Sequence, residues 1–214
     1  MTTMRRVLAS RDRGFTMAEL LVTMMLMSII SAVVLSTVVI VGRNVVRDQA
    51  KGDSLDIARV GMNRMSKAVR AGTEVPVNGS SNLPAFAEIG PETLTVYASL
   101  GSAPTKTQYT IDAQRQLIET QWTADTSNAP YYTFATTPRV TEIASQIPAG
   151  SGLFKFYDAN GALVSPQTTT DPTVLSLVRS VEINLMVNSN PTQNVPPVSI
   201  NSTVVLPNLG VVKR

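Results

Sequence analysis

The fold of this chain is decided by one apolar stretch, residues 15–41, which reads FTMAELLVTMMLMSIISAVVLSTVVIV. It contains no Gly and no Pro, and Glu19 is its one ionisable side chain. As an α-helix it extends roughly 40 Å, enough to cross a hydrocarbon core of about 30 Å. We therefore predict a transmembrane helix over residues 15–41.

A second, amphipathic helical segment is predicted to follow. All 13 prolines lie at Pro76 or later, so no earlier residue must break a helix. Between residues 42 and 71, apolar side chains recur at alternating intervals of three and four, which places them on one helical face. They are Leu55, Ala58, Met62, Met65 and Val69, and the basic residues mostly off that face are Arg59, Arg64, Lys67 and Arg70. We predict a stalk helix over residues 42–71 that packs its apolar face on the domain after it.

The remaining residues, 72–214, have the pattern of β-strands separated by turns. The predicted strands are 94–98, 108–111, 116–121, 131–134, 140–143, 153–157, 162–164, 181–187 and 198–206, with hairpin turns at 112–115 and 158–161. After Pro172, residues 174–178 fit either a helix or a strand. Strands that follow one long helix, without strand–helix alternation, indicate an α+β fold with that helix packed on an antiparallel sheet.

The composition limits the chemistry that the chain can perform. There is no His and no Cys, which removes imidazole acid–base catalysis, thiol nucleophiles and the usual zinc ligand sets. The carboxylates of residues 72–214 show no catalytic spacing, and no glycine-rich phosphate loop is present. We expect no catalytic residue, no cofactor and no metal site.

The net charge of +3 and the isoelectric point near 9.4 taken alone suggest nucleic acid or anionic lipid as a partner. However, four arginines and one aspartate lie within residues 1–14, so the side chains of the rest of the chain are formally balanced. Within that rest, residues 43–70 are net basic and residues 71–214 are net acidic. This distribution neither requires nor excludes direct binding of nucleic acid.

The basic segment 1–14 and the carboxylate of Glu19 restrict the kind of membrane segment. An ordinary secretory signal has small residues at a cleavage site just after its apolar core, and no such site follows Val41. An uncleaved membrane anchor is one interpretation. A carboxylate near the bilayer centre costs about 2.5–3.5 kcal/mol. Glu19 therefore either lies at the interface, near the amides at the helix N-terminus, or pairs with a cation.

One segment resembles the prepilin processing motif of type IV pilins and type II secretion pseudopilins: Gly14-Phe15-Thr16-Met17-Ala18-Glu19-Leu20. The resemblance implies that a membrane peptidase cuts between Gly14 and Phe15 on the cytoplasmic side, and that the new terminus, Phe15, is N-methylated. It also implies that Glu19 is the assembly carboxylate, which pairs with the N-terminal amine of a neighbouring subunit. Met17 stands where Leu is frequent in the family.

The resemblance also implies a pilin-like fold and a structural role, with residues 72–214 as an extracytoplasmic globular domain. The size of that domain and the segments 154–161 and 181–187 look like minor pilins or pseudopilins of the J or W type. The implied partners are other pilin or pseudopilin subunits, prepilin peptidase, an inner-membrane assembly platform and membrane lipid. The implied location is the inner membrane, in single-pass form with a cytoplasmic N-terminus, and then a surface or periplasmic filament. The alternative is an uncleaved, membrane-anchored extracytoplasmic binding protein.

Two further groups of residues have more than one interpretation. The aromatic residues Trp122, Tyr131, Tyr132 and Phe134 are assigned to core packing, with an aromatic binding face as the alternative. Asp158 and Asn160 occupy positions that could open a calcium loop, but the alternating strands on both sides favour a turn.

Overall fold

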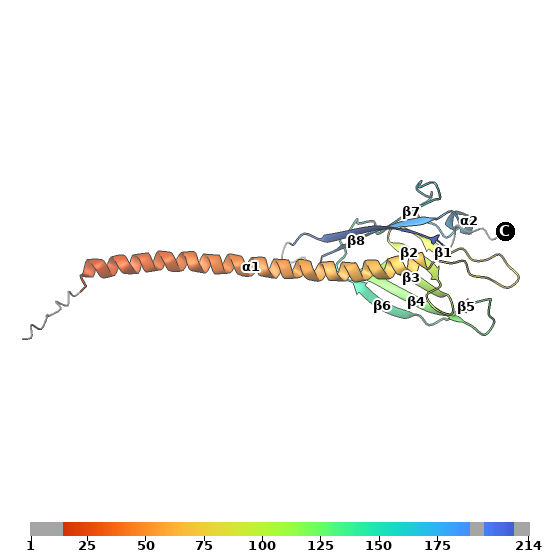
Figure 1. Ribbon diagram of the computed structural model, residues 1–214, viewed down its shortest axis with the longest axis horizontal. Coiled ribbons are helices and arrows are strands. Elements are labelled where there is room, and N and C mark those ends of the chain that lie inside the picture. The colour runs from red at the N-terminus through yellow and green to blue at the C-terminus, as the bar shows by residue number, and fades with distance from the viewer. Residues whose placement is uncertain (1–14, 189–194, 208–214) are drawn as a thin grey trace, which may run out of the picture. The chain divides into compact units, whose positions relative to one another are not determined.

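The structure, a computed structural model, describes residues 15–188 and 195–207. The predicted leader, residues 1–14, lies outside the described residues. The chain divides into two compact units, Met1–Val46 and Arg47–Arg214. Helix α1, Met17–Arg70, runs through both and is drawn from red to yellow in Figure 1. The prediction of one long N-terminal helix is confirmed.

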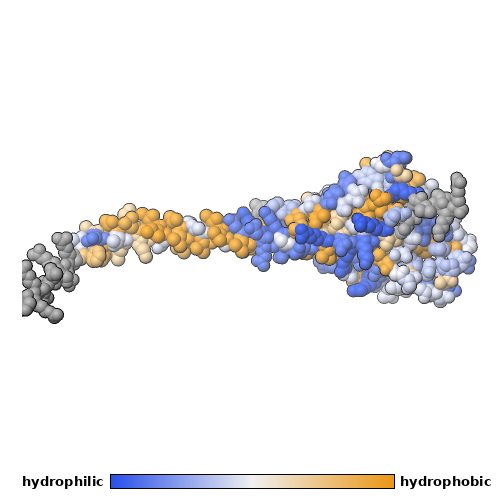
Figure 2. All heavy atoms as spheres, in the orientation of Figure 1, coloured by the Kyte–Doolittle hydropathy of each residue, from blue (hydrophilic) through white to orange (hydrophobic). Residues whose placement is uncertain are grey.

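The described part of the first unit is the N-terminal part of α1, with Phe15 and Thr16 before it. Every residue from Phe15 to Val46 is exposed, and Figure 2 shows this part mainly in the hydrophobic colour. The hydroxyls of Thr23, Ser28 and Ser36 each donate to a backbone carbonyl three residues earlier. These hydroxyls therefore need no partner from lipid, which suits an apolar environment.

In the second unit, α1 buries one face against the β-strands. Its buried residues are Ala50, Ser54, Ala58, Gly61, Met62, Met65, Ala68 and Val69. The predicted apolar face is confirmed from Ala58 onward, whereas Leu55 is only partly buried. The four basic residues predicted off this face, Arg59, Arg64, Lys67 and Arg70, are exposed.

The described part of the chain forms two sheets, and the larger one has six antiparallel strands. They are β1 (Phe86–Ile89), β2 (Thr93–Ala98), β3 (Thr105–Ile111), β4 (Leu117–Asp125), β5 (Thr133–Phe134) and β6 (Arg139–Ala144). The strands β1 to β5 neighbour one another in chain order, and β6 also pairs with β4. β4 can pair with both strands because β5 pairs with its last two residues, Ala124 and Asp125, whereas β6 pairs with its residues 117–121.

The smaller sheet has three antiparallel strands, β7 (Phe154–Tyr157), β8 (Ser180–Val187) and β9 (Val198–Val205), in that order. A short helix, α2 (Pro172–Leu175), precedes β8, and the Asp171 carboxylate accepts a hydrogen bond from the Thr173 amide at its start. A proline in the first turn and a capping aspartate favour a helix here. Of residues 174–178, whose structure was left open, Val174 and Leu175 are therefore helical and none lies in a strand.

A single apolar core joins the two sheets and α1. Phe86 of β1 lies edge-on to Phe156 of β7, with ring centroids 6.4 Å apart, so the two sheets meet through aromatic rings. Met65 and Val69 of α1 are fully buried in the same core. The prediction of a long helix packed on antiparallel β-structure is confirmed. The architecture is α+β and pilin-like, and the described strands form two sheets.

Three strand predictions need correction. β1 was not predicted, because FAEI has only four residues and its buried residues, Phe86 and Ile89, do not alternate with exposed ones. Residues 162–164 do not form a strand, since the segment makes one isolated bridge, Leu163 to Tyr157, after the turn at Gly161. The predicted strand 131–134 shrinks to Thr133–Phe134, because Tyr131 and Tyr132 belong to the loop before β5.

The absence of a side chain at Gly61 allows α1 to approach the sheets closely. A Cβ atom there would lie 3.0 Å from Ile143 Cγ2 and 3.0 Å from Leu185 Cδ2, whereas one at Gly52 meets nothing within 4 Å. We expect Gly61→Val to destabilise the chain by about 1–3 kcal/mol through overpacking. Gly52→Val, a matched change on the same helix, is expected to alter stability by less than about 0.5 kcal/mol. Chemical denaturation of both variants measures the difference, and equal effects would contradict this role of Gly61.

Candidate functional site at the helix N-terminus

The start of α1 is fixed by a capping interaction between Thr16 and Glu19. The Glu19 backbone amide donates to Thr16 Oγ1 at 3.3 Å, and the Leu20 amide donates to the Thr16 carbonyl at 3.1 Å. Thr16 is therefore the N-cap, and Glu19 occupies the third helical position, which is the residue spacing of a capping box. Our sequence reasoning missed Thr16, although the spacing Thr-x-x-Glu was available as a signal.

The Glu19 carboxylate has no cation beside it among the described residues. Their ion pairs all lie between Asp56 and Glu182, within the second unit. The next basic residue along α1 is Arg43, which comes about 36 Å further along the helix. Within α1, the helix N-terminus is therefore the one positive field near Glu19, and a full positive charge must come from outside this helix.

The two residues on either side of the predicted cleavage point, Gly14 and Phe15, precede this cap in the sequence. Phe15 precedes the helix and its side chain is 77% exposed. Gly14 lies outside the described residues. The Phe15 side chain is therefore not packed against other described residues.

The helix that follows the cap is long and apolar enough to cross a membrane. An 18-residue window of α1 reaches a mean hydropathy of 2.6, and none of it is buried. A fully exposed apolar helix of this length is unfavourable in water, so it needs lipid or other apolar helices around it. The helix fits a membrane-anchored, single-pass protein.

Comparison with known families agrees with this geometry. The prokaryotic N-terminal methylation motif matches residues 9–35, a range that contains the predicted cleavage point, the capped helix start and Glu19. The chain thus carries the signature of a type IV pilin or pseudopilin precursor, the class that prepilin peptidase processes. The match covers the N-terminal segment alone and does not distinguish a pilin from a pseudopilin. No curated protein matches the sequence.

The second unit contains clusters of polar side chains, and their hydrogen bonds hold turns and loops in place. In the described part of the chain, no three acidic residues gather in the way that a metal ion requires. The Asp158 carboxylate accepts hydrogen bonds from the amides of Asn160 and Ala162, which makes it the centre of a turn. Arg115, with φ of 60°, donates to Glu92 Oε1 at 2.8 Å and to the carbonyls of Ile147 and Pro148. It ties the β3–β4 turn to a neighbouring loop.

The assignment of the four aromatic residues to core packing is wrong. Tyr131 is exposed, and Trp122, Tyr132 and Phe134 are only partly buried. Phe134 stacks on Tyr97 with ring centroids 5.2 Å apart, and Lys106 Nζ lies 4.9 Å from the Trp122 ring centroid. Adjacent residues on a strand face opposite sides, so Tyr131 and Tyr132 could not both point into the core from an extended segment.

Glu182 is the centre of a polar network on the smaller sheet. Tyr157 Oη donates to Glu182 Oε2 at 2.6 Å, Asn201 Nδ2 donates to Oε1 at 3.2 Å, and Lys155 Nζ lies 3.4 Å from Oε1. The hydrogen bond from Tyr157, followed by that from Asn201, lowers the pKa of Glu182 below its ordinary value of 4.5. The network stabilises the ionised carboxylate.

This network predicts a pH-dependent contribution to stability. A carboxylate with a lowered folded-state pKa stabilises the fold fully above its unfolded pKa, and this contribution is lost as the pH falls through the folded pKa. We expect Tyr157→Phe to reduce the free energy of unfolding at pH 7, and the gap from the native chain to shrink as the pH falls below about 4.5. Denaturant titrations at several pH values measure the gap. Tyr131→Phe, whose hydroxyl bonds to no described carboxylate, is the control, and a gap that is constant down to about pH 3 contradicts the prediction.

Proposed function

We propose that this chain is a minor pilin or pseudopilin, a structural subunit of a type IV pilus or type II secretion-like filament, that enters the filament through its N-terminal helix. Prepilin peptidase cuts the precursor between Gly14 and Phe15, and the new amine of Phe15 is methylated. Residues 15–41 are the membrane and assembly helix, residues 42–71 the stalk, and residues 72–214 the extracytoplasmic domain. The observation that carries the proposal is the methylation motif at residues 9–35, which overlaps the first part of the exposed apolar helix that begins at Met17.

The physics of the capped helix supports this role. Before cleavage, the basic segment 1–14 holds the N-terminus on the cytoplasmic face. After cleavage, the apolar helix leaves lipid only for another apolar environment, and a bundle of like helices is such an environment. The first basic residue after Glu19 on its own helix is Arg43, about 36 Å away along the helix axis. Pairing Glu19 with the terminal ammonium of a neighbouring subunit offsets the cost of burying either charge alone.

The assignment to a minor subunit of the J or W type rests on the size of the β domain. Its described residues form nine strands in two sheets and a short helix, with the 154–161 segment forming β7 and its turn. The partners in this role are other pilin or pseudopilin subunits, an inner-membrane platform and, indirectly, an assembly ATPase. The chain acts as a structural subunit and not as an enzyme.

Mass spectrometry of the mature N-terminus tests the proposal. In cells with an active prepilin peptidase, we expect the chain to begin at Phe15 with one methyl group on its amine. In cells that lack the peptidase, and for a Gly14→Val variant in peptidase-positive cells, we expect residues 1–14 to be retained. A mature chain that keeps Met1–Gly14 in peptidase-positive cells contradicts the proposal and favours an uncleaved anchor for a binding domain.

A further inference from the structure

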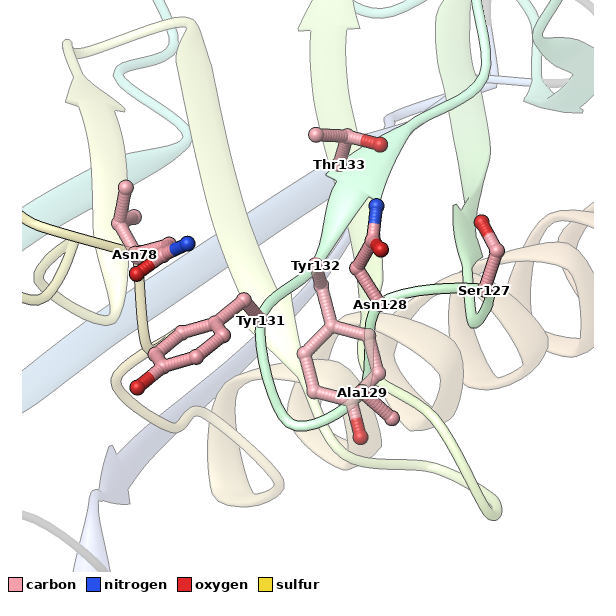
Figure 3. Close-up of a pocket in the computed structure, with 8 residues that line it drawn as sticks. Asn78, Ser127, Asn128, Ala129, Tyr131, Tyr132 and Thr133 are labelled. Atoms are coloured by element: carbon pink, nitrogen blue, oxygen red, sulfur yellow. The ribbon is translucent and has the colours of Figure 1, made fainter.

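We propose that the β domain carries a binding site for a small neutral saccharide, in a cleft between the 75–83 turn and the β4–β5 loop. This proposal goes beyond the assembly role and does not depend on it. The cleft has a volume of about 540 Å³, within the range of small-ligand sites. Figure 3 shows its lining residues, which are Val77, Asn78, Ser127, Asn128, Ala129, Tyr131, Tyr132 and Thr133.

The two segments that form the cleft are held by backbone hydrogen bonds. Val75 and Leu83 exchange amide–carbonyl bonds of 3.0 and 2.9 Å, which closes the turn that carries Asn78. Across the cleft, β4 and β5 pair at Asp125 and Thr133, and the Tyr131 amide donates to the Asn128 carbonyl at 2.9 Å. The site is therefore formed by closed loops on a sheet, which limits the ordering cost of binding.

The Asp125 carboxylate sets the shape of the β4–β5 loop. It accepts hydrogen bonds from the Ser127 amide at 2.9 Å and the Ser127 hydroxyl at 2.5 Å, and these bonds lower the pKa of Asp125. Asp125 does not line the cleft. Its charge is satisfied within the loop, so it holds the loop in place without adding charge to the site.

The groups that face the cleft are free to bind. Among the hydrogen bonds of the described residues, none uses the side-chain amides of Asn78 and Asn128 or the hydroxyls of Tyr131 and Tyr132. An amide offers both donors and an acceptor, and a phenol offers one of each. In Figure 3 the ring of Tyr131 extends toward the segment that carries Asn78, whereas the ring of Tyr132 lies beside Asn128 and Ala129. Tyr131 is 41% exposed, so its ring is accessible.

Because the lining residues of the cleft are uncharged, they favour an uncharged ligand. Among the described residues, no Lys, Arg, Asp or Glu lines the cleft, so phosphates, nucleic acids and carboxylate ligands find no opposite charge there. Only Val77 and Ala129 are purely apolar, which is too few for a hydrophobic ligand. A neutral saccharide combines hydroxyls that donate and accept with C–H faces that pack on aromatic rings. Two tyrosines beside two asparagines match that combination.

A glycan array with the full-length chain tests this proposal. The chain is placed in lipid nanodiscs without glycolipid, because sugar-based detergents would compete for the site. The array presents neutral oligosaccharides beside sialylated and sulfated ones, and calorimetry with the free sugar then measures the affinity of each hit. We expect neutral oligosaccharides to bind. No binding of any neutral sugar, or binding of anionic sugars alone, overturns the proposal.

Matched variants locate the binding on the cleft. We expect Tyr131→Ala to weaken binding about tenfold or more, since truncating an aromatic anchor removes much of a binding free energy. Asn78→Ala, on the opposite side, is expected to weaken it as well, whereas Leu163→Ala, an exposed apolar residue outside the cleft, leaves it unchanged. Thermal unfolding checks that each variant is folded. Unchanged affinity in both cleft variants overturns the proposal. Cleavage at Phe15 is measured in the same variants and remains intact, so each proposal can fail separately.

Discussion

Replacing Glu19 by alanine is expected to abolish incorporation of the chain into filaments while leaving cleavage of the precursor intact. The cap at Thr16 and the apolar helix both remain, so the peptidase still receives its substrate. The proposed partner, the ammonium of a neighbouring Phe15, would lose its counter-charge. Leaving one member of a buried ion pair unpaired costs about 3–5 kcal/mol, or more than a hundredfold in an equilibrium constant. Immunoblots of sheared filaments measure incorporation, and mass spectrometry of the membrane fraction measures cleavage.

Glu19→Gln separates the charge of this residue from its place in the helix cap. A glutamine at the third helical position keeps the backbone amide that donates to Thr16 Oγ1, and Glu and Gln are both favoured at that position. If pairing with an ammonium is what matters, Glu19→Gln fails to enter filaments as Glu19→Ala does. Normal recruitment of the glutamine variant contradicts the pairing role and leaves Glu19 as a capping residue. Thr16→Ala provides the converse control, since it removes the capping hydroxyl and keeps the carboxylate.

Much of the fold was predictable because its patterns are local. The strand β8 alternates buried and half-buried residues along its whole length, and the predicted strand 198–206 forms its neighbour β9. The buried face of α1 follows a helical period that the sequence shows directly. The division into two sheets was not predictable in this way. It depends on which strands pair across long stretches of chain, and periodicity carries no information about that pairing.

The candidate site at the helix start was predictable, and the cleft in the β domain was not. Gly14, Phe15 and Glu19 lie within one short motif, and the interpretation of Glu19 needs only its position in an apolar run. The cleft brings Asn78 and Tyr131 together from segments about fifty residues apart, through the fold of the whole β domain. No local pattern indicates that two such loops meet. The pair Tyr131-Tyr132 was nevertheless a usable sign, because adjacent aromatic residues cannot share one buried strand face.

The aromatic contact between the two sheets is expected to dominate the stability of the β domain. Phe156 is fully buried, with ring centroids 6.4 Å from Phe86 in the other sheet and 6.2 Å from Phe154. On the side of β7 away from β8, the side chain of Gln167 hydrogen-bonds the Phe156 backbone. Gln167 Nε2 donates to the Phe156 carbonyl at 3.0 Å, and Gln167 Oε1 accepts from the Phe156 amide at 3.0 Å. The strand is therefore held from both sides, and it cannot readily collapse into a space left by a smaller side chain.

We therefore expect Phe156→Ala to destabilise the β domain by about 3–5 kcal/mol, from lost apolar burial and the cavity left between the sheets. The single tryptophan, Trp122 in β4, reports unfolding of this domain without signal from the apolar helix. Denaturation of the full chain in nanodiscs, followed by tryptophan fluorescence, measures the loss. Phe156→Leu keeps most of the volume and is expected to lose less than Phe156→Ala. Leu163→Ala, at an exposed site, is expected to change stability by less than about 0.5 kcal/mol. A loss below about 1 kcal/mol for Phe156→Ala would mean that the sheets are not held together by this contact.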